Sequence, residues 1–194
     1  MTPWLILILA YLLGAIPTGY WLGLRWKGVD VRKQGSGNLG ATNVFRVLGK
    51  GPGIVTLVVD ILKGYIPVAL AQHAAGADSL WAIAAGALAI LGHTTSPFVG
   101  FRGGKGVATS AGVFAALLPL PIALAALAFA LTFGISRYVS LSSITAALVL
   151  AVVAVCEPVT MILKVMTIAV ALFVIVKHRG NIQRLRAGTE NRFK

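Results

Sequence analysis

Four consecutive residues, Gly103-Gly104-Lys105-Gly106, combine the residue types that hold an anion in a protein loop. Glycine allows backbone shapes in which N–H groups turn toward a ligand, and lysine adds a full positive charge. The residues that follow read as the first turn of a helix, whose N-terminus carries free N–H groups and partial positive charge. The stretch is not a Walker A loop, which would need glycine in place of Val99 and serine or threonine in place of Gly106. It predicts an anion site without identifying the anion.

A second glycine-rich stretch, RKQGSGNLGATNVFRVLGKGPG, begins at Arg32. Its glycines allow successive N–H groups to converge on an anion. Ser36, Asn38 and Asn43 add neutral hydrogen-bonding groups, and Arg46 adds a planar guanidinium suited to a phosphate. We expect the segment LGATNVFRVLG to be helical. A flexible linker is the alternative, but a linker does not need two asparagines and an arginine interleaved with glycine.

Two further polar stretches, ISRYVSLSSI and KHRGNIQRLRAGTENRF, lie nearer the C-terminal end. Ser142 in the first stretch either caps the helix that follows or contacts a ligand. His178 in the second can exchange a proton near neutral pH, or it is only a polar residue at the level of the lipid headgroups. Asn181 follows it by three residues, close to the end of the last apolar run.

The chain that carries these stretches is mostly apolar, with 58% hydrophobic and 11% charged residues and a mean hydropathy of +0.89. Apolar runs of bilayer-spanning length recur, so we predict an all-α fold, a multi-pass integral membrane bundle of about seven transmembrane helices in one domain, residues 1–194. Because proline disrupts helical hydrogen bonding, Pro119 and Pro121 separate two short spans. A five-span fold that merges or omits these two is the alternative. The expected spans are residues 3–24, 52–72, 79–96, 107–119, 121–135, 142–156 and 159–176.

Positive charge is distributed unevenly among the segments between the spans. Of the 17 Lys and Arg residues, only Lys63 and Lys164 lie outside the four segments that seven spans would put on one side. Such an excess marks the cytoplasmic side, so we expect the N-terminus outside and the C-terminus in the cytoplasm. The net charge of +12 then reflects topology and attraction to anionic headgroups, and it does not indicate nucleic-acid binding. Lys105 taken alone could equally be such a topology anchor. The four segments are residues 25–51, 97–106, 136–141 and 177–194.

Few reactive or charged residues lie inside the spans. Asp60 and Lys63 are three residues apart on one helix face, where they can pair, and we favour a structural ion pair over direct ligand contact. Cys156 is the only cysteine and reads as apolar filler. The sequence has neither a cysteine pair nor a carboxylate cluster suited to a metal ion, so we expect no metal and no cofactor.

Taken in order, these blocks resemble a known family. The stretches GSGNLGATNVFRVLGKGPG, DILKG, GHTTSPFVGFRGGKGVATSAG, SRYVSLSSI and KHRGNIQRLRAGTE are similar to the successive motifs of the bacterial acyl-phosphate:glycerol-3-phosphate acyltransferases of the PlsY type. The resemblance implies transfer of a fatty acyl group from acyl phosphate to the 1-hydroxyl of sn-glycerol 3-phosphate. The products are lysophosphatidic acid and phosphate, in the first acylation of phospholipid synthesis. It also implies the bacterial inner membrane, an active site on the cytoplasmic face, and no need for acyl-CoA or acyl carrier protein.

The resemblance further implies roles for individual residues. It associates the loop Gly103–Gly106 with the binding of glycerol phosphate. It associates Ser36 and Arg46 of the first block, and His178 and Asn181 of the last block, with activity. It gives Glu190 a structural role. The expected phosphate-binding residues are Ser36, Asn38, Asn43, Arg46, Gly103, Gly104, Lys105, Gly106 and Ser142. The expected catalytic residues are Ser36, Arg46, Lys105, His178 and Asn181.

Acyl phosphate is a mixed anhydride with a competent leaving group, so direct attack by the hydroxyl is favoured over an acyl-enzyme. Asp30 and Glu190 are the only carboxylates in the polar segments. The candidate bases are His178, His93 and a phosphate oxygen of the substrate, and we favour the phosphate because the sequence shows no carboxylate that would orient an imidazole.

Two other functions are open from the residues alone. A membrane transporter for phosphorylated organic anions would place its binding groups near the bilayer midplane, in broken helices related by inverted repeats. The glycine-rich loops lie instead at one rim of the predicted bundle, and we find no repeat. A non-catalytic lipid-binding scaffold is the second alternative, and it would not need four separate polar blocks.

Overall fold

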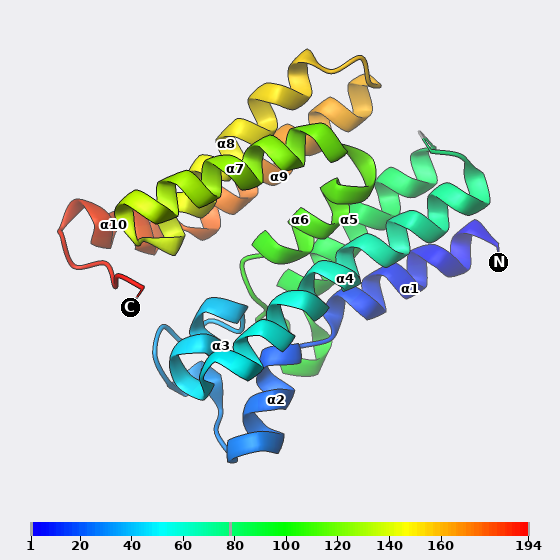
Figure 1. Cartoon of the computed structure of the whole chain (residues 1–194). Helices are drawn as coiled ribbons and strands as arrows, with labels where there is room; N and C mark the ends of the chain where they lie inside the picture. The colour runs from blue at the N-terminus through cyan, green and yellow to red at the C-terminus, as the bar shows by residue number, and fades with distance from the viewer. Residues whose placement is uncertain (1, 78, 194) are drawn as a thin grey trace. The chain divides into compact units, whose positions relative to one another are not determined.

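The computed structural model describes residues 2–77 and 79–193, and all regular structure within them is helical (Figure 1). Short 3-10 helices, η1 (Val31–Lys33) and η2 (Pro97–Val99), lie in two of the connections. The α-helices of the described residues are α1 Pro3–Ala15, α2 Thr18–Lys27, α3 Ala41–Leu48, α4 Lys50–Ala75, α5 Leu80–Thr94, α6 Val107–Leu117, α7 Pro119–Ser136, α8 Val139–Cys156, α9 Met161–Lys177 and α10 Arg179–Arg186.

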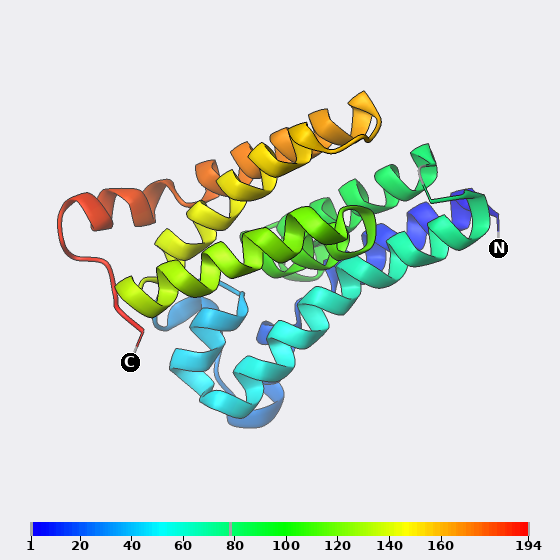
Figure 2. The same cartoon turned by 45° about the horizontal axis from the view of Figure 1, so that its top comes forward.

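The chain forms two compact units, and the first is Met1–Leu117. In this unit α1 packs against α4 and α5, and α6 packs against the same two helices (Figures 1 and 2). Glycine makes the contacts close, because a Cβ at Gly14 would collide with the backbone of Ala89, and one at Gly64 with the backbone of Thr109. Small residues at such crossings let helix backbones approach within a membrane.

The second unit is Leu118–Lys194. Here α7 packs against α8 and α8 against α9, while the short α10 contacts α8 and α9. The chain after α10 returns to the end of α7, where the Phe193 N–H donates to the Arg137 carbonyl over 2.8 Å. The Phe193 ring also packs edge-on against Phe133. The tail is thereby attached to the helices of its own unit.

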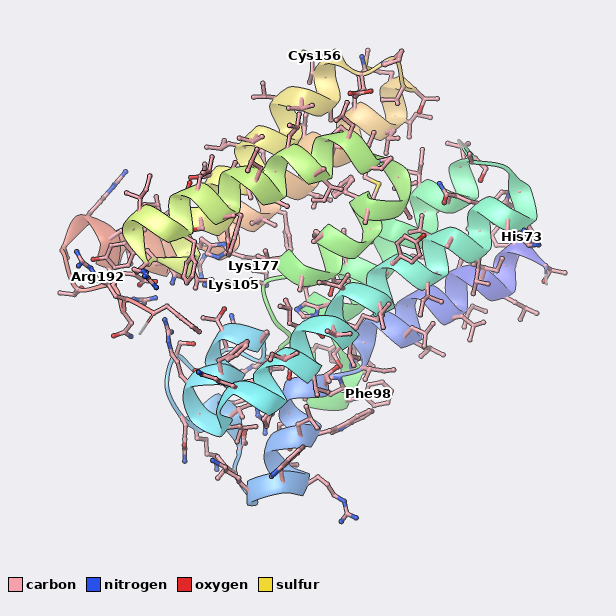
Figure 3. The ribbon with its side chains drawn as sticks, viewed as in Figure 1. His73, Phe98, Lys105, Cys156, Lys177 and Arg192 are labelled. Carbon is pink, nitrogen blue, oxygen red and sulfur yellow. The ribbon has the colours of Figure 1, made fainter. Side chains whose placement is uncertain are left out.

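Within each unit the polar connections lie at one end of the helices (Figure 3). In the first unit Phe98 and Lys105 lie at the end opposite His73. In the second unit Lys177 and Arg192 lie at the end opposite Cys156. This arrangement is the one that the uneven distribution of positive charge leads us to expect, and the orientation across a membrane stays a prediction.

Four segments are long and apolar enough to cross a membrane: Lys50–Ala75, Leu80–Val99, Pro119–Ser136 and Val139–Cys156. Two bent pairs pass the same test if each pair counts as one span, which raises the number to six within the described residues. An all-helical membrane fold is therefore confirmed. The number of seven spans and the single domain stay predictions.

The predicted first span, residues 3–24, is wrong as one continuous helix. It is divided into α1 and α2, whose axes differ by 44°. The break falls at Ile16 and Pro17, where Ile16 has φ −57° and ψ 113°. Proline has no N–H to continue the helical hydrogen bonds, and its ring disfavours the helical conformation of the residue before it.

The span predicted at residues 107–119 is a short helix. Its helix α6 ends at Leu117 after 11 residues, which at 1.5 Å per residue is about 16 Å, roughly half of a bilayer core. The next helix α7 starts directly at Pro119, a position where the missing N–H costs nothing. The prolines do separate two helices, as predicted, but only α7 has the length of a span.

Helix α8 begins at Val139, three residues earlier than the predicted start of its span. Ser142 therefore lies inside the helix and does not cap it, contrary to one of the two roles considered for it. Its buried hydroxyl donates to the Tyr138 carbonyl over 2.9 Å. The other role, contact with a phosphate, stays a prediction.

Candidate active site

Asn43 organises the first glycine-rich loop from inside. Its side chain is 1% exposed, and its Nδ2 donates to the carbonyls of Val31, over 3.0 Å, and Gln34, over 3.1 Å. Its Oδ1 accepts the Ser36 N–H over 2.8 Å. Gly35 has φ +58°, and a Cβ there would collide with the same Oδ1. Both amide protons of Asn43 are thus used within the loop, which gives this residue a structural role and leaves it no side-chain proton for a phosphate.

The other polar residues of this loop are more accessible. Ser36 is exposed, so its hydroxyl lies at the surface of a loop that Asn43 holds in place. The Oδ1 of Asn38 accepts the Gly40 N–H over 2.8 Å, which fixes the residue just before α3. Arg46 is exposed on α3, the helix predicted for LGATNVFRVLG. Ser36 and Asn38 lie in a hydrogen-bonded loop and Arg46 lies on the helix that follows it, so a flexible linker does not describe this segment.

The second glycine-rich loop packs on the C-terminal end of α5. The N–H groups of Gly103 and Gly104 donate to the carbonyls of Thr94, over 3.1 Å, and His93, over 3.2 Å. A Cβ at Gly103 would collide with the His93 carbonyl, and one at Gly104 with Nε2 of the His93 ring. These two glycines are needed for close packing, and their N–H groups already have acceptors. The phosphate-binding role predicted for Gly103, Gly104, Lys105 and Gly106 stays a prediction.

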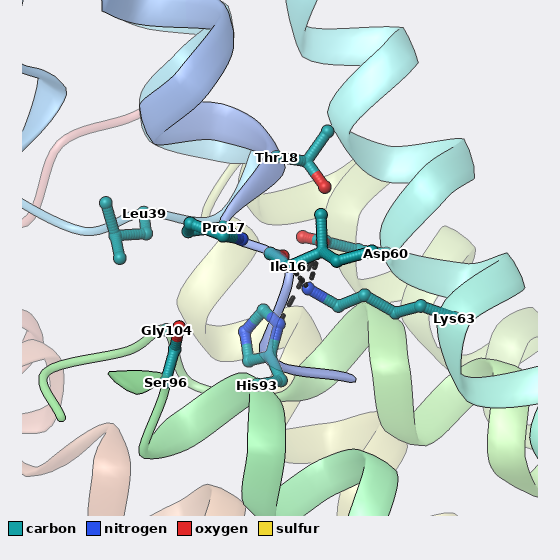
Figure 4. A pocket seen from close by; sticks show the side chains of 9 residues that line it. All are labelled: Ile16, Pro17, Thr18, Leu39, Asp60, Lys63, His93, Ser96 and Gly104. Carbon is teal, nitrogen blue, oxygen red and sulfur yellow. Dashed lines mark hydrogen bonds and ion pairs between the residues drawn. The ribbon is translucent and has the colours of Figure 1, made fainter. Parts of the chain in front are cut away.

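A buried ion pair lies beside this loop (Figure 4). Lys63 Nζ is 2.7 Å from Asp60 Oδ1, and both side chains are less than 5% exposed. The pairing predicted from their spacing on α4 is confirmed. Lys63 also donates to the Ile16 carbonyl over 2.8 Å, at the break between α1 and α2, and His93 Nδ1 lies 3.9 Å from Asp60 Oδ1. A pocket of about 10 Å³, room for about one water molecule, is lined by the ion pair, His93 and Gly104.

The tail carries a second polar cluster, centred on Glu190. Its Oε1 accepts hydrogen bonds from Ser140 Oγ over 2.7 Å and Asn181 Nδ2 over 2.6 Å, and its Oε2 accepts from Arg184 Nε over 2.7 Å. Burial by itself raises the pKa of Glu190, but the hydrogen bonds from these three residues outweigh it and lower the pKa below its usual value. This carboxylate links α8, α10 and the tail, and these contacts support the structural role expected of it.

His178 lies at the junction of α9 and α10 and is buried. Its Nδ1 is 2.7 Å from the Val174 carbonyl. A carbonyl oxygen only accepts, so Nδ1 carries the proton in this contact and, in the neutral ring, Nε2 carries the lone pair. His178 is therefore a buried and oriented side chain, and both its proton exchange and its position at headgroup level stay predictions.

The remaining carboxylate of the polar segments, Asp30, is paired with Arg32 over 2.8 Å. The side-chain hydrogen bonds from Arg32 lower the pKa of Asp30 to about 2. Since Glu190 is also engaged, both carboxylates are anions held by other residues near neutral pH and are poor bases. Direct attack by the hydroxyl stays a prediction.

The sequence did not predict two of these arrangements. Ser140 was not distinguished from the other serines near it, although it reaches Glu190 over 50 residues of sequence. Ser96 is the second case, because its Oγ donates to the Ala15 carbonyl over 2.5 Å. Both serines bond to groups far away in the chain, which no local pattern indicates.

Known proteins resemble this chain over its whole length. The family model described as glycerol-3-phosphate acyltransferase matches residues 4–188. Curated proteins named glycerol-3-phosphate acyltransferase include one from Geobacter metallireducens, 54% identical over 98% of this chain and 97% of that protein. Another, from Geotalea daltonii, is 49% identical over 100% of both chains.

Solved structures agree. A crystal structure of PlsY (YgiH), an integral membrane glycerol 3-phosphate acyltransferase in its glycerol 3-phosphate form, superposes with a TM-score of 0.95 at 41% identity, covering 100% of this chain and 96% of that one. The lysophosphatidic acid form of PlsY superposes with a TM-score of 0.91 at 40% identity, with the same coverage. The full-length match, the shared helical membrane fold and the order of the polar blocks lead to one conclusion: this chain belongs to the glycerol-3-phosphate acyltransferase family.

Proposed function

We propose that this protein transfers a fatty acyl group from acyl phosphate to the 1-hydroxyl of sn-glycerol 3-phosphate and forms lysophosphatidic acid. One observation carries the proposal: the whole chain matches a glycerol 3-phosphate acyltransferase whose structure is known in forms named for glycerol 3-phosphate and for lysophosphatidic acid. Acyl phosphate as the donor is consistent with the PlsY-type motifs. The transporter alternative has no comparable support, because the matched relatives carry the name of an acyltransferase.

The chemistry needs no covalent intermediate. The hydroxyl oxygen attacks the acyl carbonyl carbon and forms the new ester bond. The tetrahedral oxyanion then collapses, the bond between the acyl carbon and the phosphate oxygen breaks, and inorganic phosphate leaves with the electron pair. The hydroxyl proton passes to a base, for which a phosphate oxygen of the substrate is our first candidate. The protein must hold two phosphates and stabilise the oxyanion.

We assign the phosphate contacts to Ser36, Arg46 and Lys105. His178 and Asn181 form a second group of residues that we expect to be needed for activity. The exposed position of Ser36 and Arg46 on an ordered loop and helix supports the first assignment. The hydrogen bonds that hold His178 to Val174 and Asn181 to Glu190 support the second, because a rigid side chain positions a reacting group better than a mobile one.

We place the reaction at the cytoplasmic face of the bacterial inner membrane. The bacterial origin of the relatives and the integral membrane fold support the location. The concentration of Lys and Arg in the polar segments supports the side. Glycerol 3-phosphate, which is soluble in water, would reach the polar loops from the cytoplasm, and the acyl chain would lie in the bilayer.

The donor can be tested with purified protein. In detergent micelles with glycerol 3-phosphate, we expect palmitoyl phosphate to give lysophosphatidic acid and phosphate in equal amounts, whereas palmitoyl-CoA and palmitoyl acyl carrier protein give neither. EDTA should not change the rate, because no metal is expected to take part. A thioester used at a rate comparable to acyl phosphate would contradict the donor. Loss of activity in EDTA that Mg²⁺ restores would contradict only the expectation about metals.

A further inference from the structure

We infer that His93 is a positioning residue for the loop Gly103–Gly106, and that the Asp60–Lys63 ion pair holds it for this purpose. The inference rests on the proposed function, in which this loop binds a substrate phosphate through Lys105. His93 itself is 7% exposed and its ring lies between the ion pair and the loop (Figure 4).

The ion pair lies beside the Nδ1 edge of the imidazole. Asp60 and Lys63 come from the middle of α4, and Lys63 also donates to the Ile16 carbonyl, which the break before Pro17 exposes. His93 Nδ1 is 3.9 Å from the Asp60 carboxylate. A buried ion pair often adds little stability compared with apolar residues of the same size. Stability alone therefore does not explain why this ion pair is present. Fixing a histidine at the end of α5 would explain it.

The other edge of the imidazole meets the loop. A Cβ at Gly104 would collide with His93 Nε2, and the Gly104 N–H donates to the His93 carbonyl. One residue of α5 therefore contacts Gly104 through both its backbone and its ring. The next residue in the chain is Lys105. The ring thus sets how closely the loop approaches α5 and, through it, where the Lys105 side chain begins.

This geometry also bears on the candidate bases. One ring edge of His93 faces the Asp60 carboxylate and the other faces Gly104. A base must reach the hydroxyl proton of the substrate directly or through one water. Both ring edges of His93 lie against the protein, beside a pocket with room for about one water molecule, so its contact with the loop is direct and its role as a candidate base stays a prediction.

Two substitutions separate the two edges of the ring. Asparagine places its amide near the position of Nδ1 but does not reach Gly104, whereas glutamine places its amide near the position of Nε2. We expect His93→Asn to raise KM for glycerol 3-phosphate about tenfold and to change kcat and KM for acyl phosphate less than about twofold. His93→Gln should stay close to the wild-type values. A merely structural role would not produce this difference between the two variants.

A paired substitution tests the contact itself. Gly104→Ala should remove most activity, because its methyl group has no room beside the ring. The double variant His93→Asn/Gly104→Ala should recover at least about tenfold of that loss, since the shorter side chain vacates the space. Gly103→Ala is the matched control, because its Cβ meets the His93 carbonyl, which every substitution of His93 retains. No rescue is expected for His93→Asn/Gly103→Ala.

The fold is monitored by thermal unfolding in detergent, with Tyr11→Phe as a reference. That variant removes a hydrogen bond of 3.0 Å to the Thr95 carbonyl at the same end of α5 without touching the loop, and its KM values should be unchanged. A double variant as inactive as Gly104→Ala, or an unchanged KM in His93→Asn, overturns the inference. If the inference is overturned, Lys105→Ala shows whether the proposed phosphate site fails with it. An unchanged KM for glycerol 3-phosphate in Lys105→Ala would mean that the phosphate site fails as well. A raised KM would mean that only the role of His93 is lost.

Discussion

At the scale of single residues, His178 is the group whose chemistry the structure changes most. We favoured a substrate phosphate as the base partly because no carboxylate was available to orient an imidazole. The Val174 carbonyl provides that orientation instead, since it accepts the Nδ1 proton. This removes one argument against His178. A separate argument still favours the phosphate: two bound phosphates would already bring an anionic oxygen to the reacting hydroxyl.

We therefore still expect His178→Asn to retain a measurable rate. Asparagine can donate to the Val174 carbonyl in place of Nδ1, but its amide cannot accept a proton near neutral pH. Single-turnover measurements with saturating substrates would give the chemical rate, and glycerol 3-phosphate binding would be measured separately. An enzyme that binds both substrates normally and shows no turnover would make His178 the base.

Arg46 and Lys105 are the cations best suited to phosphate, and their contributions can be measured in the same way. If each makes one charge-assisted contact, Arg46→Ala or Lys105→Ala should lose about 2 kcal/mol of transition-state binding, roughly 30-fold in kcat/KM. Arg46→Lys should recover only part of the loss, because lysine cannot reproduce the planar guanidinium. Lys33→Ala is the control, because Lys33 is an exposed cation of the first glycine-rich stretch and its removal should leave kcat/KM close to the wild-type value. Wild-type activity in either alanine variant would place the phosphate elsewhere.

At the scale of elements, the first glycine-rich loop is ordered by one buried amide. The three hydrogen bonds of Asn43 join α3 to the residues around η1, whereas Asn38 makes one local bond to the Gly40 N–H. The two asparagines look equivalent in the sequence as phosphate donors. They differ in the structure because Asn43 lies on the inner face of α3 and Asn38 precedes that helix.

This difference predicts unequal effects. Asn43→Ala leaves the buried Val31 carbonyl and two partly buried backbone groups without this partner. Such a loss costs about 1–3 kcal/mol, so the open loop should become at least about fivefold more populated. Trypsin cleavage after the exposed Lys33 reports that population when closing is faster than cleavage. Asn38→Ala is the matched variant and should be cleaved close to the wild-type rate. Equal cleavage of the two variants would show that Asn43 does not hold the loop.

At the scale of the whole molecule, the charge distribution predicts an orientation. We expect Ala77→Cys, in a Cys156→Ser background, to react with a membrane-impermeant maleimide in intact cells. Gln183→Cys in the same background should react only after the membrane is permeabilised. Ala77 is exposed and lies outside the helices, so the substitution removes neither a helix cap nor a buried contact. Labelling of Gln183→Cys in intact cells would reverse the orientation.

The sequence by itself determined the class of the fold and the order of the polar blocks. The length of an apolar run can be read from consecutive residues. The ends of helices α4, α5, α7 and α8 could therefore be predicted to within a few residues. Asp60 and Lys63 could be paired for the same reason, because a spacing of three residues puts side chains on one helix face. Pro17 interrupts the first apolar run in the sequence as well, and the length of that run alone does not show that the helix breaks there.

Only the tertiary structure decided what the glycines and polar residues do. Gly103 and Gly104 read as anion-binding residues, yet their missing side chains make room for His93, and their N–H groups bond to α5. Asn43 reads as a ligand donor, yet its protons bond to the loop. The physical reason is the same in each case. A hydrogen-bonding group or an empty Cβ position looks identical in the sequence whether it faces a ligand or another part of the chain, and only packing selects its partner.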